Sequence, residues 1–325
     1  MKYQAQAPLR IDFGGGWTDV PAFAEADDEG GAVLNAAISV YAKGYVIRPY
    51  SALLPVTPAL PWGEAHTSTH SPMARLASKI GRGAHNVVHY ELNAPAGAGL
   101  GGSAAQTLLW LTLVKTVIAN VSDRKELAER AWRIENELGL IGGKQDQYCS
   151  ALGGINYMTF GKETSVEALR PGLGLIDQLE GRLSIFYTGQ SHLSGDIHEA
   201  VWSRYRAGDE AVVAALRELR RIAGDQREAL MNGDLDRLGA LLNENWTAQK
   251  QLHPSVTTER LDSLVGTALA NGAIGAKATG AGGGGCLLCL AEAGAGGGLV
   301  EGMRDAGASL IPFRFDWYGV HLTKG

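Results

Sequence analysis

A glycine-rich stretch near residue 100 has the composition of an anion-binding loop. The sequence PAGAGLGGSAA, residues 95–105, carries glycines at positions 97, 99, 101 and 102. Without Cβ atoms, consecutive backbone N–H groups can close around one anion. A β-branched run, 86–92, precedes the loop, and an apolar segment with the character of a buried helix, 106–120, follows it. Strand, loop and helix in this order predict a phosphate at the helix N-terminus.

Two other interpretations of this loop remain open. Gly97, Gly99 and Gly102 satisfy the G-x-G-x-x-G pattern of dinucleotide-binding units, with Asp123 about 20 residues further on. The residues between them read as one helix and Asp123 is better placed to cap the next, so the second strand of such a unit is missing. The other alternative is a turn that packs strand against helix without a ligand. No Lys-Ser or Lys-Thr follows the glycines, which excludes a Walker A loop.

Charged residues near the N-terminus stand beside glycines. Arg10 and Asp12 alternate with apolar neighbours, so they would share one face of a strand. Asp19 follows the triple glycine 14–16, which allows close approach of the backbone to a ligand. A guanidinium suits a phosphate, and a carboxylate can accept hydrogen bonds from sugar hydroxyls. An ion pair on the surface beside a tight turn is the alternative.

A further carboxylate, Asp146, follows two glycines in the run GGKQDQY, residues 142–148. Such a position is unusual for a solvated surface charge. If it is buried near Lys144, this carboxylate could orient or deprotonate a hydroxyl nucleophile, and a cationic partner would keep it ionised. The alternative is an aspartate that only caps a helix.

The thiols and imidazoles offer weaker candidates. Cys286 and Cys289 spell C-x-x-C within an apolar run, where strand residues three apart point to opposite faces, so we predict core packing rather than redox or metal chemistry. Three cysteines, with Cys149, are too few for a disulfide scaffold. Four histidines lack a convincing metal-ligand spacing and are predicted to lie in solvated loops: His66, His70, His85 and His89.

Composition limits the classes of partner. The chain has 325 residues, of which 45% are hydrophobic, enough for a substantial core in one large or two medium domains. Its net charge is -5 and no basic block stands out, which argues against nucleic acid or a membrane surface. No apolar span and no signal-peptide core is evident. We therefore predict a cytoplasmic protein, monomer or homodimer, that binds small molecules.

These residues need a framework of strands and helices to position them. The runs 32–40 and 42–47 predict an antiparallel hairpin, and a proline-rich stretch, 49–61, predicts an irregular excursion. Apolar stripes predict helices over 124–139, 209–232, 235–253 and 257–271. Further strands are expected over 183–188, 286–291 and 309–321.

Three segments of the chain together resemble the signature motifs of the GHMP small-molecule kinases. They are APLRIDFGGGWTDV at 7–20, PAGAGLGGSAA at 95–105 and KATGAGGGGCLL at 277–288. The family is named for galactokinase, homoserine kinase, mevalonate kinase and phosphomevalonate kinase, and the resemblance covers nearly the whole chain. The runs GGGWTD and GKQDQY resemble its sugar kinases, most of all those for D-glycero-D-manno-heptose 7-phosphate, with L-fucokinase and galactokinase as relatives.

The resemblance implies an α+β architecture, the GHMP kinase fold. An N-terminal half like ribosomal protein S5 domain 2 would meet a ferredoxin-like C-terminal half across the active cleft. We place the two domains at residues 1–175 and 176–325.

The resemblance also implies roles for individual residues. Asp146 matches the family's catalytic aspartate and Arg10 the basic residue that assists it. Ser103 would reach Mg²⁺ with Glu135 as the second metal ligand; Glu137 is the fallback, because the spacing to the aspartate is one residue shorter than in the family. The implied contacts to the ATP phosphates are Pro95, Gly97, Gly99, Leu100, Gly101, Gly102, Ser103 and Ala104. The implied substrate contacts are Gly16, Thr18, Asp19, Gly280, Gly282 and Gly283.

The implied activity is that of an ATP-dependent phosphotransferase with an alcohol group as acceptor. The γ-phosphoryl of MgATP would pass to a sugar hydroxyl, most of all the anomeric hydroxyl of D-glycero-D-manno-heptose 7-phosphate. Relatives of this type often carry an arginine near His192, so an unphosphorylated sugar such as L-fucose or galactose remains an alternative. A catalytically silent sensor of sugar and ATP on the same scaffold is the other.

Overall fold

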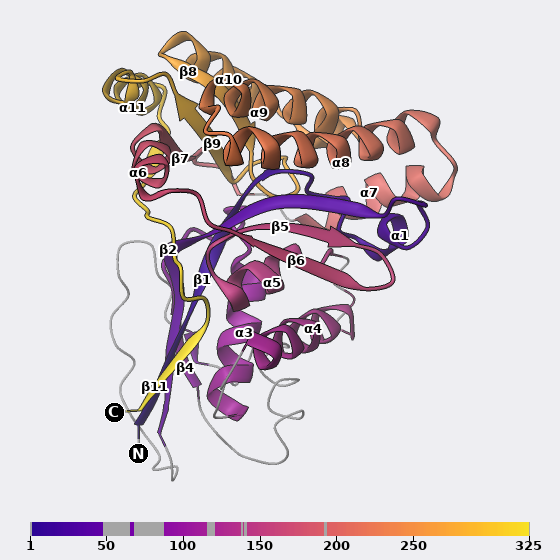
Figure 1. Ribbon diagram of the computed structural model, residues 1–325, viewed down its shortest axis with the longest axis vertical. Coiled ribbons are helices and arrows are strands. Elements are labelled where there is room, and N and C mark those ends of the chain that lie inside the picture. Colours follow the sequence, from indigo (N-terminus) through magenta and orange to yellow (C-terminus); the bar gives the residue numbers. More distant parts are fainter. Residues whose placement is uncertain are drawn as a thin grey trace.

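The structure of the protein is a computed structural model that describes residues 2–47, 66–67, 88–115, 121–137, 139, 142–191 and 194–324. Within these residues the strands form two sheets, one of seven strands and one of four. Figure 1 shows the smaller sheet at the top of the view, with helices packed on both sheets. The predicted α+β class is confirmed. The predicted excursion at 49–61 and residues His70, His85 and His192 lie outside the described residues.

The larger sheet is built on two long strands, β1 (Lys2–Gly14) and β2 (Gly31–Ile47). Its strand order is β11-β1-β2-β4-β3, and β5 and β6 extend from the other half of β2. The remaining strands are β3 (His66–Thr67), β4 (Val88–Leu92), β5 (Ile155–Phe160), β6 (Thr164–Leu169) and β11 (His321–Lys324).

The hairpin predicted over 32–47 is wrong, because β2 is one continuous strand. Pro8 of β1 pairs with Tyr41, whereas the next residue, Leu9, pairs with Ile38, so two residues of β2 are passed over. Because β1 pairs with β2 on both sides of this irregularity, the two predicted runs are parts of one strand. One half of β2 pairs with β4 and the other with β5.

Helices cover both faces of the larger sheet. The helices α3 (Gly102–Lys115) and α5 (Gln145–Leu152) contact β1 and β2, and α4 (Val121–Glu137) packs on both helices. The helix α8 (Glu210–Met231) contacts the same two strands, and Figure 1 shows it on the other side of them. Asp123 lies in the first turn of α4, not at its cap as predicted, because the helix begins two residues earlier.

The smaller sheet is antiparallel with the order β10-β7-β9-β8. Its strands are β7 (Leu183–Tyr187), β8 (Ala273–Ala278), β9 (Cys286–Ala291) and β10 (Ser309–Ile311). The strand predicted over 309–321 is wrong in its middle: β10 ends before Pro312, which cannot donate to a ladder.

Three helices of the C-terminal half were predicted within a few residues of their observed bounds: α8, α9 (Leu235–Lys250) and α10 (Glu259–Ala270). Three others were not predicted: α6 (Leu173–Arg182), α7 (Ser194–Arg206) and α11 (Gly296–Asp305). Asp209 and Thr258 cap α8 and α10, so both helices begin one residue after a side chain that accepts from their backbone. Two short helices complete the description: α1 (Pro21–Ala24) and η2 (Pro254–Val256).

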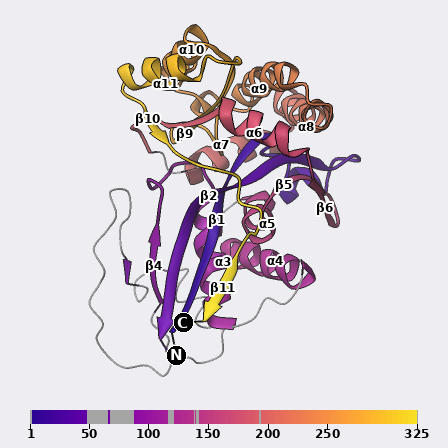
Figure 2. The same cartoon turned by 60° about the vertical axis from the view of Figure 1, so that its left-hand side comes forward.

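The last strand returns to the larger sheet. β11 pairs with β1 in antiparallel register, Tyr3 opposite Lys324, and Figure 2 shows the two ends of the chain side by side. The C-terminal segment therefore belongs structurally to the sheet that the N-terminus began. The domain boundary at 175/176 stays a prediction.

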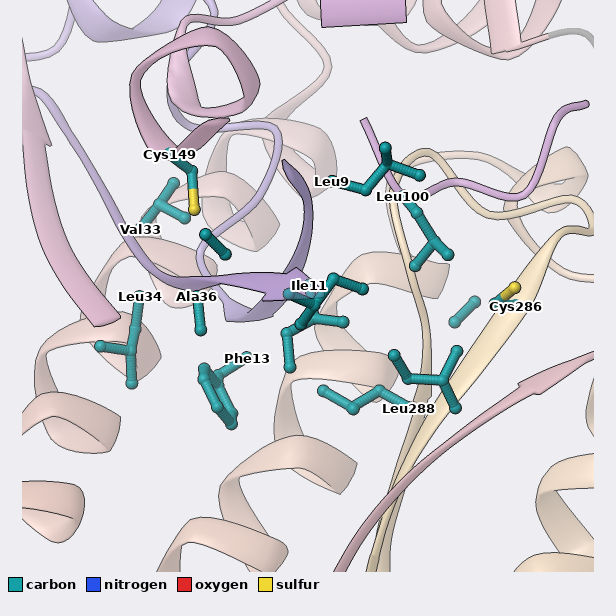
Figure 3. Close-up of a cluster of buried hydrophobic side chains, with 14 of the residues drawn as sticks. Leu9, Ile11, Phe13, Val33, Leu34, Ala36, Leu100, Cys149, Cys286 and Leu288 are labelled. Carbon is teal, nitrogen blue, oxygen red and sulfur yellow. The ribbon is translucent and has the colours of Figure 1, made fainter. Parts of the chain in front are cut away.

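A buried apolar cluster joins the two sheets beneath the glycine loop. Figure 3 shows Leu100, from the loop, near Leu9 of β1 and Cys286 of β9. Both cysteines of the C-x-x-C run are buried and free, because β9 is covered on both faces, so their predicted role in the core is confirmed. Burial raises the pKa of the Cys289 thiol to about 12, which leaves it protonated and unreactive. In the described part of the chain, no helix is long and apolar enough to cross a membrane.

Candidate active site

Arg10 joins two segments that are far apart in the sequence. Its Nε and one terminal nitrogen donate to the two carboxylate oxygens of Asp146, at 2.7 and 2.9 Å. The other terminal nitrogen donates to the carbonyl oxygen of Gly99 at 2.6 Å. Burial alone would lower the pKa of Arg10, but the charges of Asp146 and Asp12 outweigh burial and raise it. The buried guanidinium thus holds a carboxylate against the glycine loop and itself stays charged.

The glycine loop turns sharply between β4 and α3. Gly97, Gly99 and Gly101 have positive φ angles near 70°, which other residues rarely adopt. A Cβ at Gly101 would lie 3.1 Å from Arg10 Cγ and 3.3 Å from an oxygen of Asp146, so only glycine permits this approach. The backbone N–H of Arg10 also donates to the carbonyl of Leu100 at 3.0 Å. The loop therefore lies beside Asp146 and opens into α3 at Gly102, close to the predicted start at Ser103.

Asp19 approaches the N-terminus of α5, one residue from Asp146. Its Oδ2 accepts from the backbone N–H of Gln145 at 3.0 Å. Gly143 makes this contact possible, since a Cβ there would lie 1.9 Å from the same oxygen. Burial raises the pKa of Asp19 to about 6, so the carboxylate is still largely ionised at neutral pH. Such a group is suited to accept from sugar hydroxyls.

Thr18 has a different position from the one expected. It is fully buried, and its hydroxyl hydrogen-bonds with the carbonyls of Gly15 and Ala32 and accepts from the N–H of Ala32. This geometry favours a supporting role for Thr18 in the loop 15–19 over direct contact with a sugar. Gly16, by contrast, faces the site: a Cβ there would lie 3.1 Å from Asp12 and 3.2 Å from the Gln145 amide.

Ser103 and Glu135 come together, as predicted for the metal ligands. The Ser103 hydroxyl donates to Glu135 Oε1 at 2.9 Å, and Gln147 donates to Oε2 at 2.6 Å. Burial raises the pKa of Glu135 to about 7, with the nearby charge of Asp146 adding to the effect. Glu137 is exposed on α4, so the structure favours Glu135 over this fallback.

This pair of oxygen donors fits a magnesium ion. Mg²⁺ prefers hard oxygen ligands and often takes only one or two carboxylates, completing its shell with substrate phosphates. A buried carboxylate with a raised pKa lacks a compensating positive charge, and a bound cation would supply it. Among the described residues, no group of three or more His, Cys, Asp or Glu side chains could hold a metal by itself.

The third glycine segment, 279–285, packs against the glycine loop near residue 100. A Cβ at Gly280 would lie 3.0 Å from Gly99, and Thr279 hydrogen-bonds the carbonyl of Ala98 at 3.3 Å. Gly282 and Gly283 lie against η2 instead, where the N–H of Gly283 donates to Val256 at 2.7 Å. Of the three predicted substrate contacts in this segment, Gly280 is therefore the one placed nearest to the glycine loop.

The sequence analysis missed Lys277, which lies in β8 just before this segment. Its side chain is completely buried, and its Nζ donates to the side chain and the carbonyl of Asp12, at 2.6 and 3.0 Å. Burial lowers the pKa of Lys277, an effect that Asp12 opposes. The pair joins the two sheets directly below the site. A lysine inside an otherwise apolar strand, AIGAKA, was the signal that could have revealed it.

A second group that the sequence did not reveal is an aromatic pair, Trp17 and His198. The rings lie 4.4 Å apart, and Trp202 donates to His198 Nδ1 at 3.4 Å, which places the proton of the neutral imidazole on Nε2. Burial lowers the pKa of His198 to about 4, although Asp146 opposes this. Trp17 has a positive φ of 82° and a buried indole N–H without an acceptor among the described residues. Strain and an unsatisfied donor of this kind are typical of ligand sites.

A cavity of about 240 Å³ adjoins the start of the glycine loop. It is lined by β2, the segment before the loop and the end of β10, and includes Tyr41, Asn93, Pro95 and Pro312. Pro95, predicted to contact the nucleotide, is thus on its wall. Ala104, the last residue of that predicted set, is buried in the first turn of α3.

Comparison with known proteins gives consistent matches. Residues 69–154 match the family model for the GHMP kinases N-terminal domain, and residues 226–308 match the one for the GHMP kinases C terminal. The D-glycero-alpha-D-manno-heptose 7-phosphate kinase of Campylobacter jejuni is 28% identical, over 98% of this chain and 97% of its own. The Arabidopsis thaliana bifunctional fucokinase/GDP-fucose pyrophosphorylase is also 28% identical, over 89% of this chain but 30% of its own.

Similarity also extends to solved structures. A D-glycero-D-manno-heptose 1-phosphate kinase from Bacteroides thetaiotaomicron superposes with a TM-score of 0.76 and 24% identity, over 99% of both chains. At this identity the match concerns the fold.

Proposed function

The chain belongs to the GHMP kinases, and we propose that it transfers the γ-phosphoryl of MgATP to the anomeric hydroxyl of D-glycero-D-manno-heptose 7-phosphate. As a member of this family it is an ATP-dependent phosphotransferase with an alcohol acceptor. The observation that carries the proposal is the position of Arg10, which ties Asp146 to the carbonyl of Gly99. The carboxylate for the acceptor hydroxyl and the loop for the phosphates therefore share one site.

The glycine loop and α3 are suited to the triphosphate. The backbone N–H groups near Gly101 and the N-terminus of α3 would bind its oxygens. The cavity beside Pro95 would receive the nucleoside. Mg²⁺, held by Ser103 and Glu135 together with phosphate oxygens, would neutralise charge on the triphosphate.

Asp146 would accept a hydrogen bond from the attacking hydroxyl. The sugar oxygen then forms a bond to the γ-phosphorus while the bond to the bridging oxygen breaks, and ADP leaves with the electron pair. The proton of the hydroxyl is lost toward Asp146. Since the Arg10 nitrogens donate to Asp146 and Gly99, we assign Arg10 to holding this carboxylate in place rather than to contact with the moving phosphoryl.

The sugar would lie between Asp19 and the Trp17–His198 pair. Asp19 would accept hydrogen bonds from the sugar hydroxyls, while the indole N–H of Trp17 and the Nε2–H of His198 offer donors. The aromatic rings offer apolar surface for the faces of a sugar ring. Gly16 keeps the backbone close enough for contact.

The heptose 7-phosphate assignment is supported by the Campylobacter relative, which matches along nearly all of both chains. The test is a coupled assay of ADP release over D-glycero-D-manno-heptose 7-phosphate, the unphosphorylated heptose, L-fucose and galactose. We expect the heptose 7-phosphate to give the highest kcat/KM. A preference for L-fucose or galactose would change the assigned substrate but not the assigned reaction. ATP binding without ADP release on any sugar would point to a silent sensor instead.

Cytoplasmic location and a monomeric or homodimeric state remain predictions from the sequence. So does the absence of a nucleic-acid or membrane partner.

A further inference from the structure

Two buried amide side chains on α9 connect the loop that holds Asp19 to the glycine segment 279–285. Asn245 and Gln249 are one helical turn apart and are almost completely buried. Oδ1 of Asn245 accepts from the backbone N–H of Gly15 at 3.0 Å. At the other end, Nε2 of Gln249 donates to the carbonyl of Gly280 at 3.0 Å.

The two amides also bond to each other, which fixes the direction of the chain. Nδ2 of Asn245 donates to Oε1 of Gln249 at 3.4 Å. Because the N–H of Gly15 can only donate, Asn245 must present its oxygen there and its NH₂ group to Gln249. Gln249 must then present its oxygen to Asn245 and its NH₂ group to Gly280. Reversing either amide would place two donors or two acceptors face to face.

Each end of this chain is a backbone position with little freedom. Gly15 has a φ of +84°, and a Cβ there would lie 2.0 Å from the carbonyl of Ala32. Gly280 has a φ of +66° and lies against Gly99 of the glycine loop. The N–H of Gly280 also donates to Asp12 at 3.3 Å, so its amide is tied to β1 while its carbonyl is held by Gln249. A shift of either loop must therefore move or break the amide chain.

We propose that Asn245 and Gln249 are positioning residues that couple the nucleotide side of the site to the sugar side. A nucleotide that orders the glycine loop restrains Gly280 through Gly99, and the two amides pass this restraint to the loop 14–19. The sugar then binds to a loop that the nucleotide has already ordered. Its binding therefore costs less conformational entropy, which gives positive coupling between the two ligands. This inference rests on the proposed function.

The first test measures hydrogen exchange with AMP-PNP and Mg²⁺ alone. In the wild type, we expect AMP-PNP to slow exchange both in residues 97–102 and in residues 13–18. Gln249→Met and Asn245→Leu keep the size of the side chain but break the chain of hydrogen bonds. In both variants we expect protection of 97–102 without protection of 13–18. A merely structural role would change both segments equally.

Asn243→Leu is the matched control. Asn243 lies on the same helix and also makes two hydrogen bonds to backbone, but both go to β8 and neither loop is contacted. We expect this variant to transmit protection as the wild type does. Two independent variants at 245 and 249 keep the test decisive if one of them does not fold.

The second test measures the Kd of D-glycero-D-manno-heptose 7-phosphate with and without AMP-PNP. Couplings between two sites commonly lie between about 5-fold and 150-fold. We expect the wild type to bind the sugar at least about 5-fold more tightly with AMP-PNP, and the ratio to fall toward 1 in Gln249→Met.

The possible failures are distinct. If AMP-PNP leaves residues 97–102 of the wild type unprotected, the proposed function falls and the coupling with it. If it protects 97–102 but not 13–18, or protects 13–18 equally in the wild type and both amide variants, the coupling alone is overturned.

Discussion

At the scale of single residues, the site contains two carboxylates, Asp146 and Asp19, that have different neighbours. Asp146 has the guanidinium of Arg10, with side-on geometry that uses both oxygens. Asp19 accepts from the backbone and side-chain amides of Gln145 and from its own backbone N–H, and burial raises its pKa to about 6. The first carboxylate is therefore held in place by a bidentate ion pair, and the second retains the capacity to accept further donors. This difference matches the proposed division between the reacting hydroxyl and the other sugar hydroxyls.

Removing the charge of Asp146 tests its assignment. In Asp146→Asn, the side chain keeps its size but accepts a hydroxyl proton poorly, so we expect kcat to fall by about 10² to 10⁴, the range for general acid–base groups. The Kd of AMP-PNP, measured by calorimetry, should change by less than about threefold because the glycine loop remains. A kcat near the wild-type value would remove Asp146 from the mechanism.

Asp19→Asn should separate stability from function. The folded-state pKa of Asp19, about 6, lies above its unfolded value of 3.8, so the wild type loses stability as pH rises from about 4 to about 6. At pH 7.5 the variant removes this buried charge, and we expect its free energy of unfolding to be about 1 to 3 kcal/mol higher. The gain should vanish near pH 4 in urea titrations.

The same variant should bind sugar poorly. Loss of hydrogen bonds to a charged group costs about 1.5 to 3 kcal/mol, so we expect KM for the sugar to rise by about 10-fold or more. A variant that is less stable at pH 7.5 and also keeps its KM would contradict both parts of the assignment.

At the scale of elements, α5 is the part that brings the two carboxylates together. Its first turn carries Asp146, and its N-terminus receives Asp19 through the N–H of Gln145. The segment before it is anchored to α4, because Lys144 pairs with Glu129 at 3.0 Å and lies over the ring of Trp132. Tyr148 donates to the same Glu129 carboxylate at 2.7 Å. The distance between Asp19 and Asp146 is thus set by how closely the loop 14–19 can approach α5.

A methyl group at Gly143 should open this contact. Its Cβ would lie 1.9 Å from Asp19, so in Gly143→Ala the carboxylate must move away from Gln145. Displacement of a binding group by about 1 Å can cost about 100-fold in rate, and we expect kcat/KM for the sugar to fall by about 10- to 100-fold, mainly through KM.

Gly142→Ala is the control for this variant. No described atom lies within 4 Å of a Cβ at Gly142, so its kinetics should match the wild type. Equal effects of the two substitutions would show that backbone flexibility of the segment, and not the position of Asp19, limits activity.

At the scale of the whole molecule, the site lies where the two sheets meet. Lys277 of β8 and Asp12 of β1 form a buried ion pair between the sheets, and the apolar cluster around Leu9, Leu100 and Cys286 packs beside it. The glycine loop and the segment 279–285 pack backbone against backbone, whereas the loop 14–16 is linked to that segment through the side chains of Asn245 and Gln249. The proposed phosphate loop, acceptor carboxylate and sugar loop therefore meet at this junction.

Lys277→Met should destabilise the protein as a whole. Removing one partner of a buried ion pair leaves the other without compensation, and we expect the free energy of unfolding to fall by about 3 to 5 kcal/mol. Urea denaturation of the double variant Asp12→Asn/Lys277→Met should recover part of this loss, because the uncompensated charge is then gone. Full additivity of the two single substitutions would show that the pair does not interact.

The sequence by itself determined the motifs, the family and most elements, because glycine spacing, apolar periodicity and capping residues such as Asp209 act over short distances. It also identified Asp146, Asp19, Ser103 and Glu135 as candidates. Only the tertiary structure decided which of them meet. Arg10 is 136 residues from Asp146, Lys277 is 265 from Asp12, and the partnership of Trp17 with His198 requires α7 to fold over the N-terminal loop. The continuity of β2 was likewise decided by its pairing with β1, which continues on both sides of the irregularity at Pro8 and Leu9. Contacts of this kind depend on which faces are buried together, and local sequence carries no record of that.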